Sequence, residues 1–259
     1  MIISIVTITY NNFEDLVKTL ESIRGNDYIE SIVVNGGDSP ETIDYLKFHK
    51  GIVINEKDEG IADAFNKGIK ASSCDFIMFL NSGDILLNPV YLSQAVEVLN
   101  KNPQYSFVHS NILYEDAFGD KLFVKPYVKN PGRGMMYLHP SMIIIKKIFK
   151  ETGLYNLRYK IAMDFDLVVR MKKKGFKGYY LDTSPVVQME GKGKSHTSEF
   201  LAIKECIGCL RNNNYITPGN IAGVAVRLSL FLIRKIVLKL GGKKAMRILK
   251  RLKYDAIVS

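Results

Sequence analysis

Asp84 is the first residue in this chain whose position suggests chemistry. It ends the stretch Asn81-Ser82-Gly83-Asp84, which follows a continuous apolar run at 77–80. Such a run predicts a strand covered on both faces, and the turn formers after it predict a loop at its carboxyl end. Ligands of open α/β sheets bind at such strand ends, where a carboxylate can hold a divalent cation against a diphosphate. The alternative is that Asp84 only caps the loop or the next helix.

Three more polar loops follow predicted strands, at 9–12, 35–39 and 56–60. Because the carboxyl ends of parallel strands meet at one edge of a sheet, these loops and Asp84 predict a pocket there. The first strand is not followed by G-x-G-x-x-G, and G-x-x-x-x-G-K-[ST] occurs nowhere. A dinucleotide dehydrogenase and a phosphate-transferring NTPase are therefore disfavoured.

Other candidates for chemistry lie in the second half. Asp164 and Asp166 open a predicted helix, where carboxylates commonly serve only to complement the helix dipole. Cys206 and Cys209 have a metal-like spacing, but no second Cys/His pair accompanies them, which favours packing within a helix. With three cysteines in all, the chain has no disulfide framework, and a reducing compartment is expected.

The elements that position these residues alternate along the first 84 residues. Strands are predicted at 2–8, 31–34, 51–55 and 75–80, and helices at 13–23, 40–48 and 60–71, with Ser39 as a cap before Pro40. This order predicts right-handed parallel βαβ units. In the second half we expect strands at 105–114, 121–125, 142–145 and 179–189, a mobile loop at 130–134, a helix from 161, and a flexible polar segment at 190–196.

The charge of the chain is concentrated at its C-terminus. The net charge is +10, but the last 41 residues, from Gly219, hold ten Lys/Arg against the single Asp255, so residues 1–218 are near neutral. A near-neutral body argues against a nucleic-acid partner. Hydrophobic residues make up 47% of the chain, enough for a large core. The first eight residues lack the features of a signal peptide, so we expect a cytosolic protein.

The basic tail at 219–259 is predicted to form two amphipathic helices. Residues 221–240 are mostly apolar, but four Lys/Arg interrupt them, so a membrane-spanning helix is not expected. Gly241-Gly242 breaks this segment, and a second short basic helix follows at 243–253. Apolar residues mixed with Lys/Arg suit an interfacial helix on an anionic membrane. Packing on the rest of the protein and a homodimer contact are the alternatives.

Taken together, the motifs resemble those of the inverting family 2 glycosyltransferases with the GT-A fold, and among them the bacterial enzymes that build surface polysaccharides. The likeness covers about residues 1–200. The matching segments occur in the family's order: 4–12, 34–38, 56–68, 79–84, 139–141 and 161–170. The resemblance implies an α/β fold with a Rossmann-like mixed central sheet flanked by helices, plus C-terminal helices. It also implies a catalytic domain at 1–218, with a nucleotide-sugar-binding half at 1–104 and an acceptor-binding half at 105–218.

The resemblance assigns the chemistry to two carboxylates. Asp84 matches the last carboxylate of a D-x-D-like motif and would hold Mg²⁺ or Mn²⁺ against the donor diphosphate. Asn81 and Gly83 supply no second carboxylate, so Asp84 is the only one in the motif. Asp164 matches the catalytic base, which takes the proton of the acceptor hydroxyl. Asp166 is the alternative base.

The resemblance also implies positions around the substrates. Asn35 stands where relatives commonly carry Asp, so Asp38 could take over a nucleoside contact. His139, Ser141 and Asp166 are assigned to the acceptor side, and Lys192, Lys194 and His196 to a segment that could close on the diphosphate. The expected donor-binding residues are Thr7, Thr9, Tyr10, Asn11, Asn35, Asp38, Asp58, Asn66, Asn81, Ser82, Gly83 and Asp84.

The expected function is the transfer of a sugar, with inversion, from a nucleoside diphosphate donor to a saccharide or polyprenyl-linked saccharide. A UDP-sugar is the expected donor, and the inner face of the cell membrane the expected location. A nucleotidyltransferase on a related fold would release pyrophosphate instead of a nucleoside diphosphate. A catalytically silent membrane-associated scaffold is the other alternative, which the presence of both Asp84 and Asp164 argues against.

Overall fold

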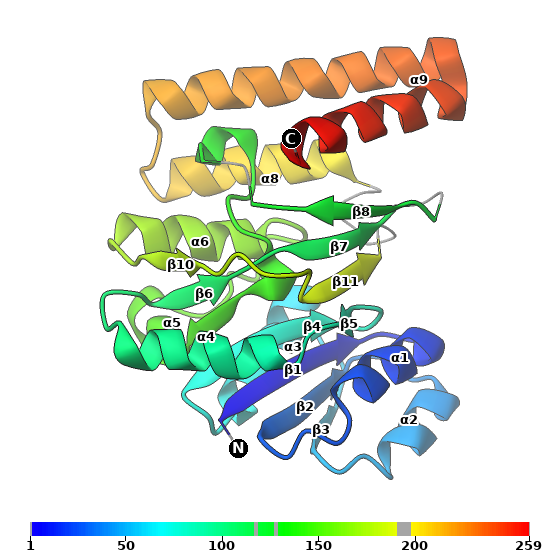
Figure 1. Ribbon diagram of the computed structural model, residues 1–259, viewed down its shortest axis with the longest axis vertical. Coiled ribbons are helices and arrows are strands. Elements are labelled where there is room, and N and C mark those ends of the chain that lie inside the picture. The colour runs from blue at the N-terminus through cyan, green and yellow to red at the C-terminus, as the bar shows by residue number, and fades with distance from the viewer. Residues whose placement is uncertain (1, 117–118, 127–128, 191–197, 259) are drawn as a thin grey trace.

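The structure is a computed structural model that describes residues 2–116, 119–126, 129–190 and 198–258. Its centre is a seven-stranded mixed sheet in the order β10-β6-β9-β4-β1-β2-β3. A smaller sheet has the order β5-β11-β7-β8. In Figure 1 the first three strands lie at one end of the molecule, and α9 lies beyond α8 at the other.

The N-terminal half forms the parallel layout that the alternation of strands and helices predicts. β1 pairs in parallel with both β2 and β4, and β2 pairs in parallel with β3. The strands are β1 (Ile3–Thr9), β2 (Ile29–Asn35), β3 (Ile52–Asn55) and β4 (Phe76–Asn81), and the helices between them are α1 (Phe13–Ile23), α2 (Pro40–Leu46) and α3 (Ile61–Ala71).

The central strands are apolar throughout because both faces of the sheet are covered. Val6 and Ile8 of β1 pack in one core with α3 and the later helix α6 (Met163–Lys173). Ile3 and Ile5 point to the other face and pack with α1 and α4 (Val90–Lys101). Each face of the sheet thus has its own core, as expected for parallel strands buried on both sides.

The C-terminal half adds strands of both directions. β9 (Ile143–Ile145) pairs antiparallel with β4 and with β6 (Phe107–His109), while β10 (Gly178–Tyr180) pairs parallel with β6. The other elements of this half and of the small sheet are β5 (Ile85–Leu86), β7 (Ile112–Glu115), β8 (Lys121–Val124), β11 (Val187–Glu190), the 3-10 helices η1 (Pro131–Arg133) and η2 (His139–Ser141), α5 (Lys147–Thr152) and α8 (Glu199–Asn212).

Each of the two long strands predicted in this half is observed as two shorter strands, one in each sheet. The predicted strand at 105–114 divides into β6 and β7, because Ser110 N–H donates to Ser141 Oγ (3.0 Å) and the Asn111 side chain donates to Asp182 (2.9 Å). These contacts turn the chain out of the large sheet. The predicted strand at 179–189 likewise divides into β10 and β11. The strand predicted at 121–125 is observed as β8, which pairs antiparallel with β7.

The predicted mobile loop at 130–134 is instead a packed 3-10 turn. The Asn130 side chain accepts from Gly132 N–H and donates to the carbonyl of Gly219. A Cβ at Gly132 would lie 2.0 Å from the carbonyl oxygen of Asn220, so only glycine permits this approach. The contact joins η1 to the start of α9 (Pro218–Val258).

The tail has the predicted break. Gly242 has φ 61° and ψ −163°, which interrupts α9, and Figure 1 shows the chain turning back after it. Within the described ranges no helix is both long enough and apolar enough to cross a membrane.

Candidate active site

The polar ends of four strands meet along one edge of the large sheet. The register of the strands pairs Thr9 with Asn35, Asn35 with Asn55, and Ile8 with Asn81. The loops predicted to form a pocket are therefore neighbours in space. Thr7 and Thr9 lie at the end of β1 with buried hydroxyls, and neither Oγ1 has a hydrogen-bond partner among the described residues.

Asn11 joins the first two of these loops. Its φ of 49° is left-handed, a conformation that Asn tolerates better than most residues. Its Oδ1 accepts from the N–H groups of Asp38 and Ser39 (both 2.9 Å), and its Nδ2 donates to Asp38 Oδ1 (3.0 Å). Asn11 thus holds the two residues just before α2, while Ser39, the predicted cap, makes no side-chain cap hydrogen bond. Tyr10 beside it is 69% exposed.

Asn35 and Asp58 shape the next part of the edge. Asn35 is fully buried: its Nδ2 donates to Asn55 Oδ1 (2.7 Å) and its Oδ1 accepts from Gly37 N–H (3.1 Å). Asp58 Oδ1 accepts from Gly60 N–H (2.8 Å). Both side chains therefore hold loops in place. Asn55 also takes part, although it belongs to none of the motifs noted in the sequence.

The loop after β4 is a tight turn that contains Asp84, a residue only 4% exposed. Asp84 N–H donates to the Asn81 carbonyl, and Asp84 Oδ2 accepts from Asn81 N–H (both 2.9 Å). Gly83 has φ 101°, which favours glycine, and its N–H donates to Thr19 Oγ1 of α1 (2.9 Å). Ser82 Oγ donates to the carbonyl of Asn12. The turn is thus fixed from α1 and from the loop after β1.

The chemistry of this turn fits a hard cation held largely by a substrate. Among the described residues no three His, Cys, Asp or Glu side chains are grouped so as to hold a metal by themselves. A carboxylate oxygen is nevertheless the ligand that Mg²⁺ prefers, and this ion is commonly bound by one or two carboxylates together with substrate phosphates. Asp84 supplies one such carboxylate.

Asp164 is the second residue of α6 and is partly exposed. Its Oδ1 accepts from Phe165 N–H (2.7 Å). Burial raises the pKa of Asp164, and the nearby His139 and the backbone hydrogen bonds only oppose this effect. A carboxylate that is accessible, and more basic than usual, can accept a proton from a hydroxyl group.

His139 lies near Asp164 and packs on Phe79 of β4, the strand that leads into the turn with Asp84. Its ring stacks on Phe79 of β4, with ring centroids 5.6 Å apart, and its Nε2 lies 2.9 Å from Tyr155 Oη. Burial lowers the pKa of His139, an effect opposed by the charge of Asp164. Burial of Tyr155 raises the pKa of its hydroxyl group, and the charge of Asp164 raises this pKa further. Tyr155 is a further member of this group that the sequence did not single out.

Asp166, by contrast, is buried and bonded to neighbouring side chains, so it stabilises the fold. It is 1% exposed; its Oδ2 accepts from Arg170 Nε (2.8 Å) and its Oδ1 from Asn213 Nδ2 (2.9 Å). Arg170 also donates to the carbonyls of Thr152, Gly153 and Leu154. With both oxygens engaged and almost no exposure, Asp166 is poorly placed to act as a base.

Two other predicted site residues mainly hold the structure together. Asn66 donates to the Tyr155 carbonyl and accepts from Tyr155 N–H (both 2.9 Å), which joins α3 to the segment before α6. Ser141 is fully buried and bonds both backbone groups of Ser110. Lys192, Lys194 and His196 lie outside the described residues.

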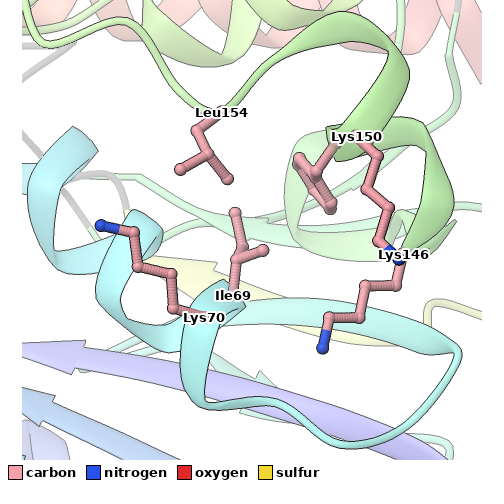
Figure 2. A pocket seen from close by; sticks show the side chains of 6 residues that line it. Ile69, Lys70, Lys146, Lys150 and Leu154 are labelled. Atoms are coloured by element: carbon pink, nitrogen blue, oxygen red, sulfur yellow. The ribbon is translucent and has the colours of Figure 1, made fainter.

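A cavity elsewhere is distinct from this edge. Figure 2 shows Ile69, Lys70, Lys146, Lys150 and Leu154, which with Phe149 line a space of about 280 Å³. Lys146 N–H donates to the Asp75 carbonyl, which lies just before β4, so the cavity is near the amino end of that strand. The cavity is therefore remote from the loop that carries Asp84.

The mixed central sheet flanked by helices is the GT-A fold, which the chain shares with solved glycosyltransferase structures. The chain belongs to glycosyl transferase family 2, whose family model matches residues 4–178, and it is a glycosyltransferase. The fold and the family predicted from the sequence are both confirmed.

Two mycobacterial proteins illustrate the relatives of this chain. It is 29% identical over 184 residues to the uncharacterized glycosyltransferase Rv1514c of Mycobacterium tuberculosis, a match that covers 65% of this chain and 68% of the relative. It is 24% identical over 183 residues to a PGL/p-HBAD biosynthesis glycosyltransferase of Mycobacterium bovis, covering 64% and 68%.

Two solved structures share the fold at low identity. TarS 1–349 of Staphylococcus aureus in complex with UDP-GlcNAc matches with a TM-score of 0.64 and 15% identity, over 88% of this chain and 72% of that one. The mannosyltransferase PcManGT of Pyrobaculum calidifontis, in complex with GDP-Man and Mn²⁺, matches with a TM-score of 0.59 and 13% identity, over 96% and 78%. The chain spans only 43% of a longer TarS structure.

Proposed function

We propose that this glycosyltransferase transfers a sugar, with inversion, from a nucleoside diphosphate donor to a saccharide or polyprenyl-linked saccharide used in surface polysaccharide synthesis. The observation that carries the proposal is the group of Asp164, His139 and Phe79. Through it, an accessible carboxylate of raised pKa is connected with the strand whose end bears Asp84.

In the proposed reaction Asp164 accepts the proton of the acceptor hydroxyl. The oxygen of that hydroxyl forms a bond to the anomeric carbon as the bond from that carbon to the diphosphate breaks. The nucleoside diphosphate leaves with the bonding electron pair. One displacement of this kind needs one base and no covalent enzyme intermediate, and it inverts the anomeric configuration.

The donor is assigned to the polar strand ends, with its nucleoside near Thr9, Tyr10, Asn11 and Asp38. Asp84 would hold Mg²⁺ or Mn²⁺ together with the diphosphate. When bound, such a cation would offset the charge that develops on the departing nucleoside diphosphate. The hydrogen bonds from Asn81 and to Thr19 would keep the turn in one conformation before the donor arrives. A UDP-sugar is the proposed donor.

A thermal-shift panel tests this assignment. UDP-, GDP- and dTDP-sugars are each added to the purified protein with and without Mn²⁺, and free sugars serve as controls. A donor that binds only the folded state stabilises it by about 2.7 kcal/mol at 100 times its Kd, which raises the melting temperature. We expect the largest rise with a UDP-sugar and Mn²⁺. No rise with any nucleotide sugar at millimolar concentration would contradict the proposed site.

We also propose that α9 docks the enzyme on the anionic inner face of the cell membrane. The side of α9 that faces the protein includes Arg227, which approaches Gly134, and Arg234, which pairs with Glu199. Large apolar side chains on other sides of the helix are 43–81% exposed: Ile221, Val226, Leu230, Leu232, Ile233, Ile236, Leu238 and Leu240. So long an exposed apolar surface is typical of a protein–membrane or protein–protein interface.

Charge favours a membrane as the partner. Lys235 and Lys239 are exposed among these apolar residues, and the sequence after Gly242 adds six more Lys/Arg. Each basic residue near an anionic surface adds about 1 kcal/mol of attraction. A lipid-linked acceptor would then be held beside the enzyme that uses it.

Flotation with liposomes tests the docking. The double variant Ile233→Asp/Ile236→Asp should float with vesicles containing anionic lipid at least tenfold less than the wild type, because buried apolar area and charge both drive binding. Phe48→Asp, which changes an 85% exposed side chain remote from α9, should float normally. Equal flotation of all three proteins would refute the docking. Dimer dissociation in the double variant, without any change in flotation, would indicate a homodimer contact instead.

A further inference from the structure

The segment that leads into α6 is held by a carboxylate from another helix. Glu205 of α8 accepts from three consecutive backbone N–H groups: its Oε1 from Lys160 (3.0 Å), and its Oε2 from Ile161 and Ala162 (both 2.9 Å). Ala162 is the residue before the first turn of α6, and α6 has no cap from a side chain of its own at this position. Glu205 therefore holds the segment that leads into α6, although it is more than forty residues away in sequence.

The last of these hydrogen bonds lies two residues from Asp164. The first hydrogen bond of α6, from Asp166 N–H to the Ala162 carbonyl (2.9 Å), starts at the residue that Glu205 fixes. Hydrogen bonds to a charged acceptor are about twice as strong as neutral ones. Glu205 is therefore one of the contacts that hold the backbone from which the first turn, with Asp164, begins.

Other contacts from α8 and the residue after it reach the same segment one hydrogen bond at a time. Asn212 donates to Tyr159 Oη (2.9 Å), and Cys209 Sγ lies 3.7 Å from the Ala162 carbonyl. Asn213, just after α8, donates to Asp166 in the first turn of α6, which like Ala162 lies two residues from Asp164. Glu205 is the contact that fixes three successive peptide groups at once. It lies beyond residues 4–178, where the family model matches.

We propose that Glu205 is a positioning residue for the reaction: it sets the geometry of the base Asp164 from outside the segment that carries the family's motifs. The inference rests on the proposed role of Asp164. Glu205 does not touch the substrates or exchange a proton in the reaction. Its removal should therefore slow the chemical step and leave the donor site, built from the loops after β1 to β4, intact.

Steady-state kinetics of Glu205→Gln and Glu205→Ala test the proposal. A displacement of about 1 Å in a catalytic group can lower the rate about 100-fold. We expect kcat to fall about 10-fold in Glu205→Gln, which keeps one acceptor oxygen, and about 100-fold in Glu205→Ala. The KM for the donor and the donor-induced thermal shift should change less than twofold. Amide hydrogen exchange at residues 160–162 should accelerate in both variants.

Two variants of the same helix serve as controls. Ile203→Val removes one buried methyl group and should lower the melting temperature without lowering kcat. Glu199→Gln removes a carboxylate whose partner is the Arg234 side chain and should keep full activity. A kcat within twofold of the wild type in Glu205→Ala would overturn the proposal. So would a loss of kcat in Ile203→Val as large as that in Glu205→Gln.

A double variant separates this proposal from the function on which it rests. If Glu205 acts through Asp164, Glu205→Ala should lower the residual rate of Asp164→Asn less than twofold, because residues that act as a unit are non-additive. A further 100-fold loss would show that Glu205 acts by another route. If Asp164→Asn alone keeps full activity, the proposed base is wrong, whatever Glu205 does.

Discussion

Replacing Asp164 with Asn is expected to lower kcat by about 10²- to 10⁴-fold, the usual contribution of a general base. Asn has nearly the same shape as Asp but cannot take the proton of the acceptor hydroxyl. The donor site lies on other loops, so the donor-induced thermal shift should remain. Steady-state kinetics with a saturating donor give the change in kcat, and full turnover by the variant would exclude Asp164 as the base.

The pH dependence distinguishes a base from a merely structural carboxylate. Because burial raises the pKa of Asp164, kcat should fall on acidification through a pKa above the ordinary value for Asp. The ionised form is the one that burial disfavours, so the folded state holds this proton more tightly than the unfolded state does. The resulting stability is present below the unfolded pKa and is lost as the pH rises through the folded pKa. Asp164→Asn should therefore be at least as thermostable as the wild type at neutral pH.

Asp166 offers the matched comparison. Removing one partner of a buried ion pair typically costs about 3–5 kcal/mol, because the other charge is left without compensation. Asp166→Ala leaves the Arg170 guanidinium without its carboxylate partner and should lower the melting temperature strongly. A stable Asp166→Ala protein with normal folding and no activity would instead favour Asp166 as the base.

Replacing Asp84 with Asn is expected to lower kcat at least about 100-fold and to abolish the extra donor stabilisation given by Mn²⁺. A metal that polarises a phosphoryl oxygen is worth several kcal/mol in the transition state, and each 1.36 kcal/mol is a factor of ten in rate. The Asn side chain retains an oxygen but not the negative charge that attracts the cation. The thermal-shift panel measures the change without requiring turnover.

Asp75 provides the control for Asp84. It is an exposed carboxylate just before the other end of the same strand, so Asp75→Asn should leave both the Mn²⁺ effect and kcat unchanged. If Asp84→Asn keeps the full Mn²⁺ effect, the cation is held elsewhere. If neither protein shows a Mn²⁺ effect while donors still bind, transfer proceeds without a bound metal at this turn.

The local pattern of the sequence was sufficient for the N-terminal half of the fold. Apolar strands buried on both faces alternate there with amphipathic helices, and both signals are contained within a few neighbouring residues. The breaks between β6 and β7 and between β10 and β11 could not be found in this way. They depend on hydrogen bonds between Ser110 and Ser141 and between Asn111 and Asp182, residues 31 and 71 positions apart.

The same reasoning explains which site residues the sequence could identify. Asp84 and Asp164 occupy motif positions with a recognisable order, so their candidacy needed no coordinates. The sequence left Asp166 as an alternative base because its pairing with Arg170 and Asn213 is visible only in the structure. Tyr155 and Glu205 were missed because neither belongs to a motif. Tyr155 is identified by its contacts with Asn66 and His139, and Glu205 by its contacts with the segment before α6.

The configuration of the released sugar is the decisive measurement for a single displacement assisted by Asp164. The donor that gives the largest thermal shift is incubated with the enzyme, with water as the acceptor, and the anomers are followed by NMR before they interconvert. The proposed mechanism predicts that the first sugar released has the opposite configuration to the donor, together with a nucleoside diphosphate, and that Asp164→Asn releases neither. Retention of configuration, or release of pyrophosphate, would contradict it.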